Sequence, residues 1–137
     1  MTKLKLTNAV DLAKARDGLI GPEQIRTVEV EALVDTGATT LVLPEDVVAA
    51  LGVHEIRRVR TRVADGSVHA VPMVGDLRIE LVGREMTCDA VVMPAGTTPL
   101  IGQIPLEELD LVVNPKSREV TANPASPDGL LYVLRVA

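Results

Sequence analysis

The chain contains, at residues 32–44, the sequence ALVDTGATTLVLP. An alternating run from Thr27 leads into it, with Val28, Val30, Ala32 and Val34 on one face and Glu29, Glu31 and Leu33 on the other. Alternation with a period of two predicts a strand, which ends here at Asp35. Gly37 permits a close backbone approach in the next turn, and the Thr36 hydroxyl can tie that turn to a neighbour. The segment therefore predicts a strand that delivers a carboxylate into a tight loop.

A short helix is predicted to begin at Pro44, directly after this loop. Proline suits the first helical position, where no backbone N–H is needed. Glu45 and Asp46 follow it, and acidic side chains are favourable at the positive end of the helix dipole. Gly52 is placed to end the helix, because glycine readily adopts the left-handed conformation found there.

A long hairpin is predicted next. Residues 58–63 alternate, with Val59, Thr61 and Val63 opposite Arg58, Arg60 and Arg62. Asp65-Gly66 follows, a dipeptide that favours a two-residue turn in which both residues have positive φ. The return strand is predicted to run from residue 67 to a turn at Gly83-Arg84. A further strand then carries Met86, Cys88, Ala90 and Val92 on one face.

The remaining elements are short. Leu4 and Leu6 alternate with polar residues and predict a strand at 3–7, whereas residues 9–16 fit a helix or a strand equally well. Glycine and proline predict a loop between Asp17 and Pro22. A second helix is predicted over residues 105–110, and the chain is predicted to close with strands at 111–113, 118–122 and 130–136.

The composition favours β-structure. The 137 residues include one Tyr and neither Phe nor Trp, so Val, Leu, Ile and Ala must fill the core. A valine-rich chain with 10 glycines and 9 prolines is typical of short strands joined by turns. The length suits one domain, and we expect residues 1–137 to form a single all-β domain with two short helices.

Charge and cysteine usage exclude several classes of protein. A formal net charge of −5 argues against nucleic-acid binding, which needs a basic surface. The sequence has no apolar run long enough for a signal peptide or a membrane span, so we expect no membrane partner. Cys88 is a lone cysteine that we expect to be buried and inert, which suits a reducing compartment, and we expect a cytoplasmic protein.

Three sequence features occur in a characteristic order. The loop at residues 35–38 comes first, then the hairpin with its tip at residues 64–67, and then PLIGQ at residues 99–103 with the helix after it. This order resembles the retropepsin-like (retroviral-type, clan AA) single-domain aspartic proteases, and the run LEELDLVV at residues 106–113 looks like their bacterial members. Ala38 is similar to the retroviral branch, since pepsins carry serine there. The resemblance spans residues 3–122 and implies an acid-protease fold, a closed β-barrel-like domain with a flap hairpin.

The resemblance implies that Asp35 is the catalytic residue of an aspartic endopeptidase. The family's chemistry needs two facing carboxylates and this chain has one such loop, so a homodimer is implied. The pair would activate a water that hydrolyses a peptide or protein substrate, with no cofactor and no metal. The resemblance implies loop support from Thr36, Gly37, Ala38 and Gly102, and substrate contacts from Thr39, Ala64, Asp65, Gly66 and Ser67. The terminal strands at 3–7 and 130–136 would be candidates for the dimer interface.

Two positions depart from the family pattern. Thr39 stands where many retroviral enzymes carry a second acid. The hairpin tip at residues 64–67 reads ADGS in place of a glycine-rich run and lacks the tyrosine found in pepsins. Both departures affect substrate contacts more than the catalytic chemistry.

Alternative interpretations stay open at this point. The chain could be a catalytically silent dimerisation or peptide-binding module with the same fold, and Asp35 could be an ordinary turn residue. The arginines at 58, 60 and 62 fit the solvated face of an edge strand, or a preference for acidic peptides. His54 and His69 have no acid or cysteine at metal-ligand spacing, which argues against a zinc site.

Overall fold

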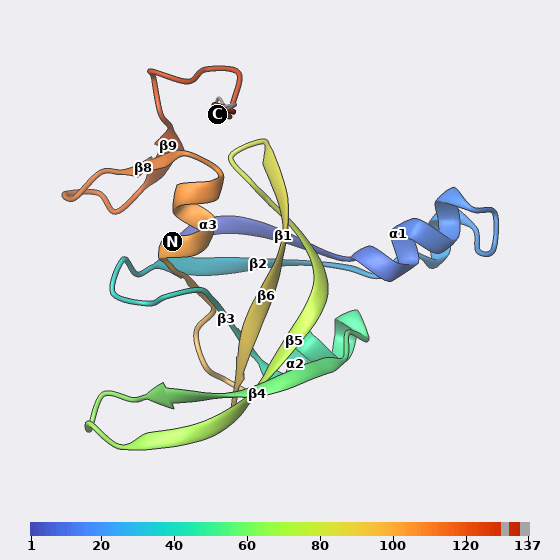
Figure 1. Cartoon of the computed structure of the whole chain (residues 1–137), viewed down its shortest axis with the longest axis horizontal. Coiled ribbons are helices and arrows are strands. Elements are labelled where there is room, and N and C mark those ends of the chain that lie inside the picture. Colours follow the sequence, from blue (N-terminus) through green and yellow to red (C-terminus); the bar gives the residue numbers. More distant parts are fainter. Residues whose placement is uncertain (130–131, 135–137) are drawn as a thin grey trace.

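The structure is a computed structural model that describes residues 1–129 and 132–134 (Figure 1). Strands predominate, which confirms the all-β prediction. They are β1 Thr2–Asn8, β2 Thr27–Val34, β3 Leu41–Pro44, β4 Glu55–Arg62, β5 Val68–Leu81, β6 Arg84–Met93, β7 Leu100–Ile101, β8 Leu111–Val113 and β9 Val120–Ala122. The helices are α1 Ala9–Arg16, the 3-10 helix η1 Pro22–Gln24, α2 Glu45–Leu51 and α3 Gln103–Glu108.

The main sheet closes on itself. Its seven strands have the order β1-β2-β7-β3-β6-β5-β4, and β1 also pairs with the second half of β5. The closed part therefore runs β1-β2-β7-β3-β6-β5, while β4 lies outside it as an edge strand. Strands β8 and β9 form a separate antiparallel pair beyond α3.

The predicted alternation of strand residues is confirmed by their burial. Leu4 and Leu6 of β1 are fully buried, and so are Leu77 and Ile79 of β5. In β2, Ala32 is also fully buried. The core cluster is aliphatic apart from Cys88, as a chain nearly without aromatic residues requires.

Residues 9–16, which the sequence left undecided, form helix α1. The Asn8 side chain caps it by accepting a hydrogen bond from Asp11 N at 3.0 Å. Asp11 in turn accepts hydrogen bonds from Arg26 Nε at 2.9 Å and Arg26 Nη2 at 3.0 Å. These bonds fix the base of an arm, residues 9–26, that projects from the closed sheet (Figure 1, right).

The turn predicted at Asp65-Gly66 was wrong in its length. Val63 N donates to Ser67 O at 3.0 Å and Gly66 N to Val63 O at 2.9 Å, which leaves a three-residue loop. Gly66 has a φ of 86°, whereas Asp65 does not have a positive φ. The reason is local: the Asp65 carboxylate accepts a hydrogen bond from Ser67 N at 2.8 Å, and this bond makes its own turn.

A two-residue turn with positive φ at both positions occurs elsewhere, at Val82-Gly83. The φ angles are 53° for Val82 and 75° for Gly83, and the turn joins Leu81 to Arg84. The prediction of Gly83-Arg84 was therefore one residue late. Valine is uncommon at positive φ, so the sequence around residue 82 gave no signal for this turn.

Several predicted boundaries were wrong by a few residues. Pro44 stays extended because it pairs with Met93 of β6, so α2 begins one residue later than predicted. Helix α3 begins at Gln103, and Pro105 lies in its first turn. Backbone N–H groups in the first turn have no acceptor within the helix, so proline, which lacks this group, removes no hydrogen bond there. Strand β4 begins at Glu55 rather than 58, β9 begins at Val120 rather than 118, and α3 ends at Glu108 rather than 110.

The predicted last strand, 130–136, lies largely outside the described residues, and residues 132–134 have no regular secondary structure. The segment before it is attached to the sheet through Arg84, whose Nη2 donates to Ser126 O. Arg84 Nη1 also donates to Leu109 O and Asp110 O, at the end of α3, at 2.9 Å each. Within the described part of the chain, no helix is long and apolar enough to cross a membrane.

Candidate active site

Asp35 lies at the end of β2, where the sheet holds its backbone in place. Leu33 N donates to Pro99 O at 2.9 Å, and Asp35 N donates to Ile101 O at 3.0 Å. Strand β7 thus lies between β2, with which it is parallel, and β3, with which it is antiparallel. The loop that carries Asp35 therefore connects β2 to β3, the two strands on either side of β7. Both ends of the loop are fixed by the sheet.

Gly102 forms the support beneath this loop. Gln103 N donates to Ala38 O at 2.8 Å and Ile104 N to Thr39 O at 2.9 Å, so the loop rests on the first turn of α3. A Cβ added to Gly102 would lie 2.4 Å from Thr40 O and 2.6 Å from Ala38 O, far inside normal contact distance. Only glycine fits this close approach. The contact explains why a glycine follows two apolar residues at this point of the sequence.

The Asp35 carboxylate is oriented by its own loop. Gly37 N donates to Asp35 Oδ1 at 2.9 Å, and Ala38 N donates to Asp35 O at 3.0 Å. A Cβ added to Gly37 would lie 3.2 Å from Asp35 Oδ1, so a larger residue would crowd the carboxylate. A side chain held by a backbone N–H in a compact turn is preorganised for chemistry at its second oxygen.

The outer side of the loop is open to solvent. Thr36, Gly37 and Thr39 are exposed, Ala38 is half-buried, and Ile104, which touches the loop through its backbone, is 48% exposed. The structure therefore brings Asp35, Thr36, Gly37, Ala38 and Gly102 together. It leaves one face of this group uncovered.

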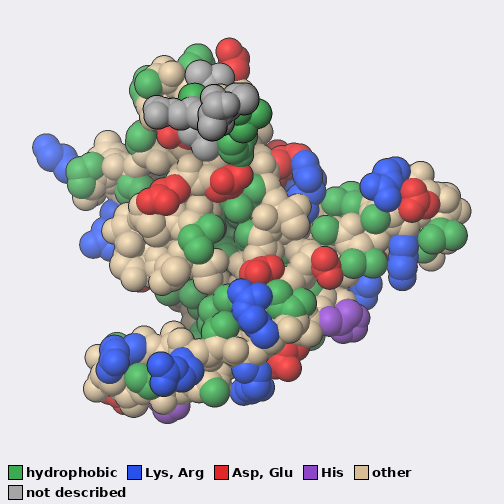
Figure 2. Space-filling view, in the orientation of Figure 1, with side chains coloured by type: hydrophobic (Ala, Val, Ile, Leu, Met, Phe, Trp, Pro, Cys, Tyr) green, Lys and Arg blue, Asp and Glu red, His purple; other side chains and the backbone are tan. Residues whose placement is uncertain are grey.

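The predicted flap is the projecting hairpin of β4 and β5. In Figure 1 its tip and the loop between β2 and β3 lie on the same side of the molecule, at the left. Figure 2 shows an open notch between this hairpin and the body of the protein. Residues 64–67 at the tip therefore lie apart from the Asp35 loop, across an open space.

A chain of hydrogen bonds orders the hairpin tip. The Asp65 carboxylate accepts hydrogen bonds from both the backbone N–H and the hydroxyl of Ser67. The hydroxyl bond, followed by the backbone bond, lowers the pKa of the Asp65 carboxyl. Ser67 Oγ also lies 2.8 Å from His69 Nε2. The polar sequence of the tip thus replaces the flexibility of a glycine-rich run with side-chain hydrogen bonds.

The site contains a contact that the sequence did not reveal. Thr40 Oγ1 donates to Asp89 O at 3.3 Å, which ties the end of the Asp35 loop to β6. The Asp89 carboxylate lies 3.6 Å from Arg57 Nη2 at the start of the hairpin. These residues are far apart in the sequence and carry no local pattern, so only the tertiary structure could identify them.

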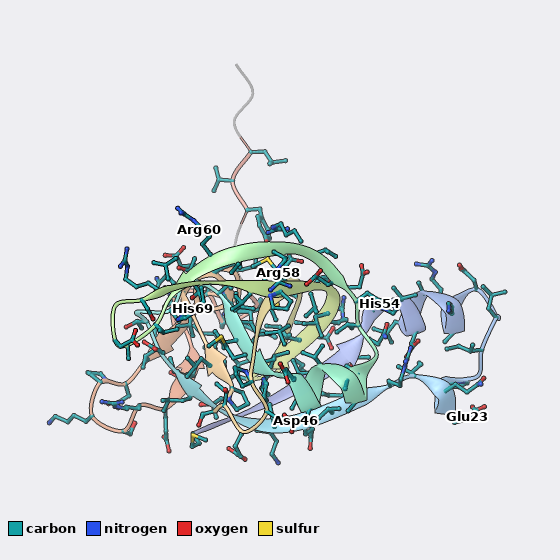
Figure 3. The ribbon with its side chains drawn as sticks, turned by 90° about the horizontal axis from the view of Figure 1, so that it is seen from below. Glu23, Asp46, His54, Arg58, Arg60 and His69 are labelled. Atoms are coloured by element: carbon teal, nitrogen blue, oxygen red, sulfur yellow. The ribbon has the colours of Figure 1, made fainter. Side chains whose placement is uncertain are left out.

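The other reactive or charged side chains lie elsewhere. Cys88 is buried, and burial, with a smaller effect from Asp89, raises the pKa of its thiol to about 12, so it stays protonated and inert at neutral pH. Arg58, Arg60 and Arg62 are exposed on the edge strand β4, and Figure 3 shows Arg60 pointing away from the ribbon.

No metal site adjoins these residues in the described part of the chain. Residues 1–129 and 132–134 contain no group of three His, Cys, Asp or Glu side chains that could hold a metal ion. Two grooves lie on the surface, one between α2 and the hairpin base and one beside Arg78, and Asp35 lines neither of them. His54 borders the first groove, well separated along the hairpin from His69 in Figure 3.

Comparison with known families agrees with the geometry. The model of the family described as "gag-polyprotein putative aspartyl protease" matches residues 22–108, well over half of the chain. The match includes the Asp35 loop, the hairpin, Gly102 and all of α3. A search of curated proteins finds no match. A strand-borne Asp-Thr-Gly loop resting on Gly102, within a closed sheet that this family model covers, places the chain among the retropepsin-like aspartyl proteases.

Proposed function

We propose that the chain is an aspartic endopeptidase that works as a homodimer, with one Asp35 from each subunit in a shared site. The observation that carries this proposal is the Asp35 loop itself. Its carboxylate is oriented by Gly37 N at 2.9 Å, its backbone is fixed by Ile101, and its outer side is exposed. An ordinary turn can share the Gly37 bond and the exposure, so what distinguishes this loop is its close support by Gly102.

The need for a second subunit follows from the chemistry. The sequence holds one Asp-Thr-Gly, and the reaction needs two carboxylates close together. A two-fold axis beside the exposed Thr36 and Gly37 would bring the two loops together. It would also cover Ile104, an apolar side chain that is 48% exposed beside the loop. Thr36 would then hydrogen-bond across the axis and hold the two loops in register.

The pair of carboxylates would divide the catalytic work. Two like charges this close cannot both ionise easily, so the pair keeps one proton, as known for pepsin and the HIV enzyme. The ionised carboxylate would take a proton from a bridging water, which attacks the peptide carbonyl carbon. The protonated one would donate its proton to the carbonyl oxygen. Because the singly protonated pair is required, the rate should fall at both low and high pH.

The hairpin would bind the substrate from the opposite side. An extended peptide would enter the open notch between the hairpin and the body of the protein that Figure 2 shows. We assign substrate contacts to residues 64–67 at the tip and to Thr39 beside the catalytic loop. An extended peptide can pair its backbone with such strands while its side chains enter pockets on either side.

We further propose that residues 1–137 form one domain in the cytoplasm. Leu111 of β8 and Val120 of β9 belong to the same core cluster as Leu4 and Leu6 of β1, which supports a single domain. A lone buried Cys88 suits a reducing compartment.

Incubation with a diverse peptide pool across pH 3 to 8 tests the proposal. We expect cleavage with a bell-shaped pH dependence that an aspartic-protease inhibitor abolishes. Asp35→Asn should lower the rate by about 10³-fold, because an amide cannot act as a base. The variant should keep its fold, since an amide oxygen can still accept the Gly37 hydrogen bond. Peptide binding without cleavage by the wild type would support the silent-module alternative instead.

A further inference from the structure

We infer that Asp89 is a positioning residue that links the base of the flap hairpin to the Asp35 loop through an ion pair with Arg57. This inference rests on the proposed function, because the hairpin position matters for catalysis only if a peptide binds beneath it. Asp89 lies in β6. In the sheet, β6 lies between β3, which follows the Asp35 loop, and β5, which belongs to the hairpin. Neither the family match nor the sequence assigns it a role.

The hairpin base is irregular in both of its strands. The pairing of β4 with β5 shifts register between Glu55 and Arg57, and the pairing of β5 with β6 shifts between Val74 and Leu77. Asp76, inside the second irregularity, has a φ of 56°. Such bulges leave residues outside the ladder and bend the strand. The two bulges lie next to each other across the hairpin base. We expect the hairpin to bend there if it moves.

Packing at the hairpin base is uneven, because Met73 and Val74 of β5 are buried against the sheet whereas the β4 side has few contacts. Gly75 N donates a long 3.3 Å hydrogen bond to His54 O. The Ile56 side chain lies over Gly75, 3.1 Å from where a Cβ would stand, yet it remains 47% exposed. A groove of about 330 Å³ separates α2 from the hairpin base on the adjoining side. The β4 strand of the hairpin base is therefore held by few contacts, and a polar contact on this strand gains importance.

Asp89 provides such a contact on both sides. Its Oδ2 lies 3.6 Å from Arg57 Nη2, and its backbone carbonyl accepts a hydrogen bond from Thr40 Oγ1 at 3.3 Å. The next residue of β6, Ala90, pairs with Leu41, which follows directly after the catalytic loop. A movement of the hairpin at Arg57 is thereby passed to the strand that holds the end of the Asp35 loop.

The ion pair is suited to positioning rather than to overall stability. Its two side chains are 56% and 42% exposed, and exposed pairs stabilise a fold only slightly. The nearest other charged residues of β4 pair with each other, Glu55 with Arg58 at 3.3 Å. Loss of the pair should therefore loosen the β4 side of the hairpin base without unfolding the sheet. The backbone bond from Thr40 would persist, so side-chain substitutions separate the two contacts of Asp89.

The test measures hairpin mobility by rapid amide hydrogen exchange over residues 55–74, together with KM and kcat on a cleaved peptide. The variants are Arg57→Gln, Asp89→Asn, the double variant, and the charge exchange Arg57→Asp with Asp89→Arg. Arg60→Gln is the matched control, because Arg60 is exposed on the same strand and has no ion pair among the described residues.

Each single variant should raise both the hairpin exchange rate and KM by about two- to five-fold with kcat nearly unchanged, as loss of an exposed ion pair predicts. In the double variant, the exchange rate and KM should rise no further than in either single variant. The charge exchange should restore both quantities to their wild-type values. In 1 M salt, which screens exposed charges, the wild type should reach the values of the variants. Additive effects in the double variant, or an equal effect of Arg60→Gln, would overturn the link. If the wild type cleaves no peptide, the proposed function fails, while the exchange measurements still decide whether Arg57 and Asp89 hold the hairpin.

Discussion

Gly102 and Asp35 illustrate how single residues constrain this site. The carboxylate depends on a loop whose backbone passes within van der Waals contact of Gly102. The φ of Gly102 is −93°, which any residue can adopt, so glycine is required here for space and not for backbone conformation. The neighbours that a side chain would meet are backbone atoms of Ala38 and Thr40, which cannot rotate away.

Gly102→Ala should therefore destabilise the protein by about 2–3 kcal/mol, the upper part of the range for overpacking a closely packed site. It should also disturb the Asp35 loop, because relief of the clash must move Ala38 or Thr40. Urea denaturation measures the first effect.

Gly21→Ala is the matched control for this substitution. The three atoms nearest to a Cβ added to Gly21 all belong to the exposed, flexible Glu23 side chain, and the φ of Gly21, −80°, is also unrestrictive. We expect a change below about 0.5 kcal/mol for the control, as for most surface substitutions. Equal losses for the two variants would show that close approach to the loop is not the reason for glycine at 102.

At the scale of elements, the arm at residues 9–26 depends on one carboxylate. Asp11 is 4% exposed and accepts hydrogen bonds from the side chain and the backbone of Arg26. These bonds, the side-chain ones first, hold the pKa of the Asp11 carboxyl at about 2, below its ordinary 3.8. The Asn8 side chain extends the contact by donating to Leu51 O at 2.8 Å. The arm base is thereby joined to the end of α2.

Asp11→Asn should cost about 2 kcal/mol at neutral pH, because it removes charge-assisted hydrogen bonds from a buried group. The sign of the pH dependence follows from the lowered pKa. The stabilisation is fully present above about pH 4, where the unfolded chain is also ionised, and is lost as the pH falls through 2. The difference in unfolding free energy between wild type and variant should therefore shrink between pH 4 and pH 2.

Asp17→Asn provides a comparison for this pH series. Asp17 also pairs with an arginine, Arg16, at 3.1 Å, but its side chain is 57% exposed. Exposed pairs contribute little, so this variant should follow the wild-type stability curve closely. A difference for Asp11→Asn that stays constant from pH 7 to pH 2 would show that its cost is steric and not electrostatic.

At the scale of the whole molecule, the number of Asp35 side chains in each active site is the decisive quantity. Mixing equal amounts of wild-type and Asp35→Asn chains tests it after subunit exchange. If each site needs both carboxylates, only wild-type pairs act, and activity per total chain should fall to about one quarter under random two-fold pairing. If each chain holds a complete site, activity should fall only to about one half.

Exchange must be verified in this experiment, for example with differently tagged chains. Sedimentation equilibrium gives an independent check, since the shared site requires a dimer at micromolar concentration. A linear fall in activity with the wild-type fraction, or a monomer that remains fully active, would contradict the shared site even though the fold is that of the family.

The amino-acid sequence alone determined the local features of this protein. Alternation from Thr27 predicted β2, and the same pattern predicted the buried face of β6, because burial on one side of a strand imposes a period of two. Asp-Thr-Gly at residues 35–37 and the glycine at 102 were singled out because the order of acid loop, hairpin, apolar pair, glycine and helix resembles that of the aspartic proteases. The sequence could not separate helix from strand at residues 9–16, where no periodicity dominates.

Only the tertiary structure decided which distant segments meet. Strand β7 lies between β2 and β3, the hairpin loop has three residues instead of two, and Asp89 reaches both Arg57 and Thr40. These features depend on strand order, on side-chain bonds such as that of Asp65, and on bulges that shift register. Local propensity carries no information about contacts between residues 32 or 49 positions apart, so the closed sheet and its cross-links had to be observed.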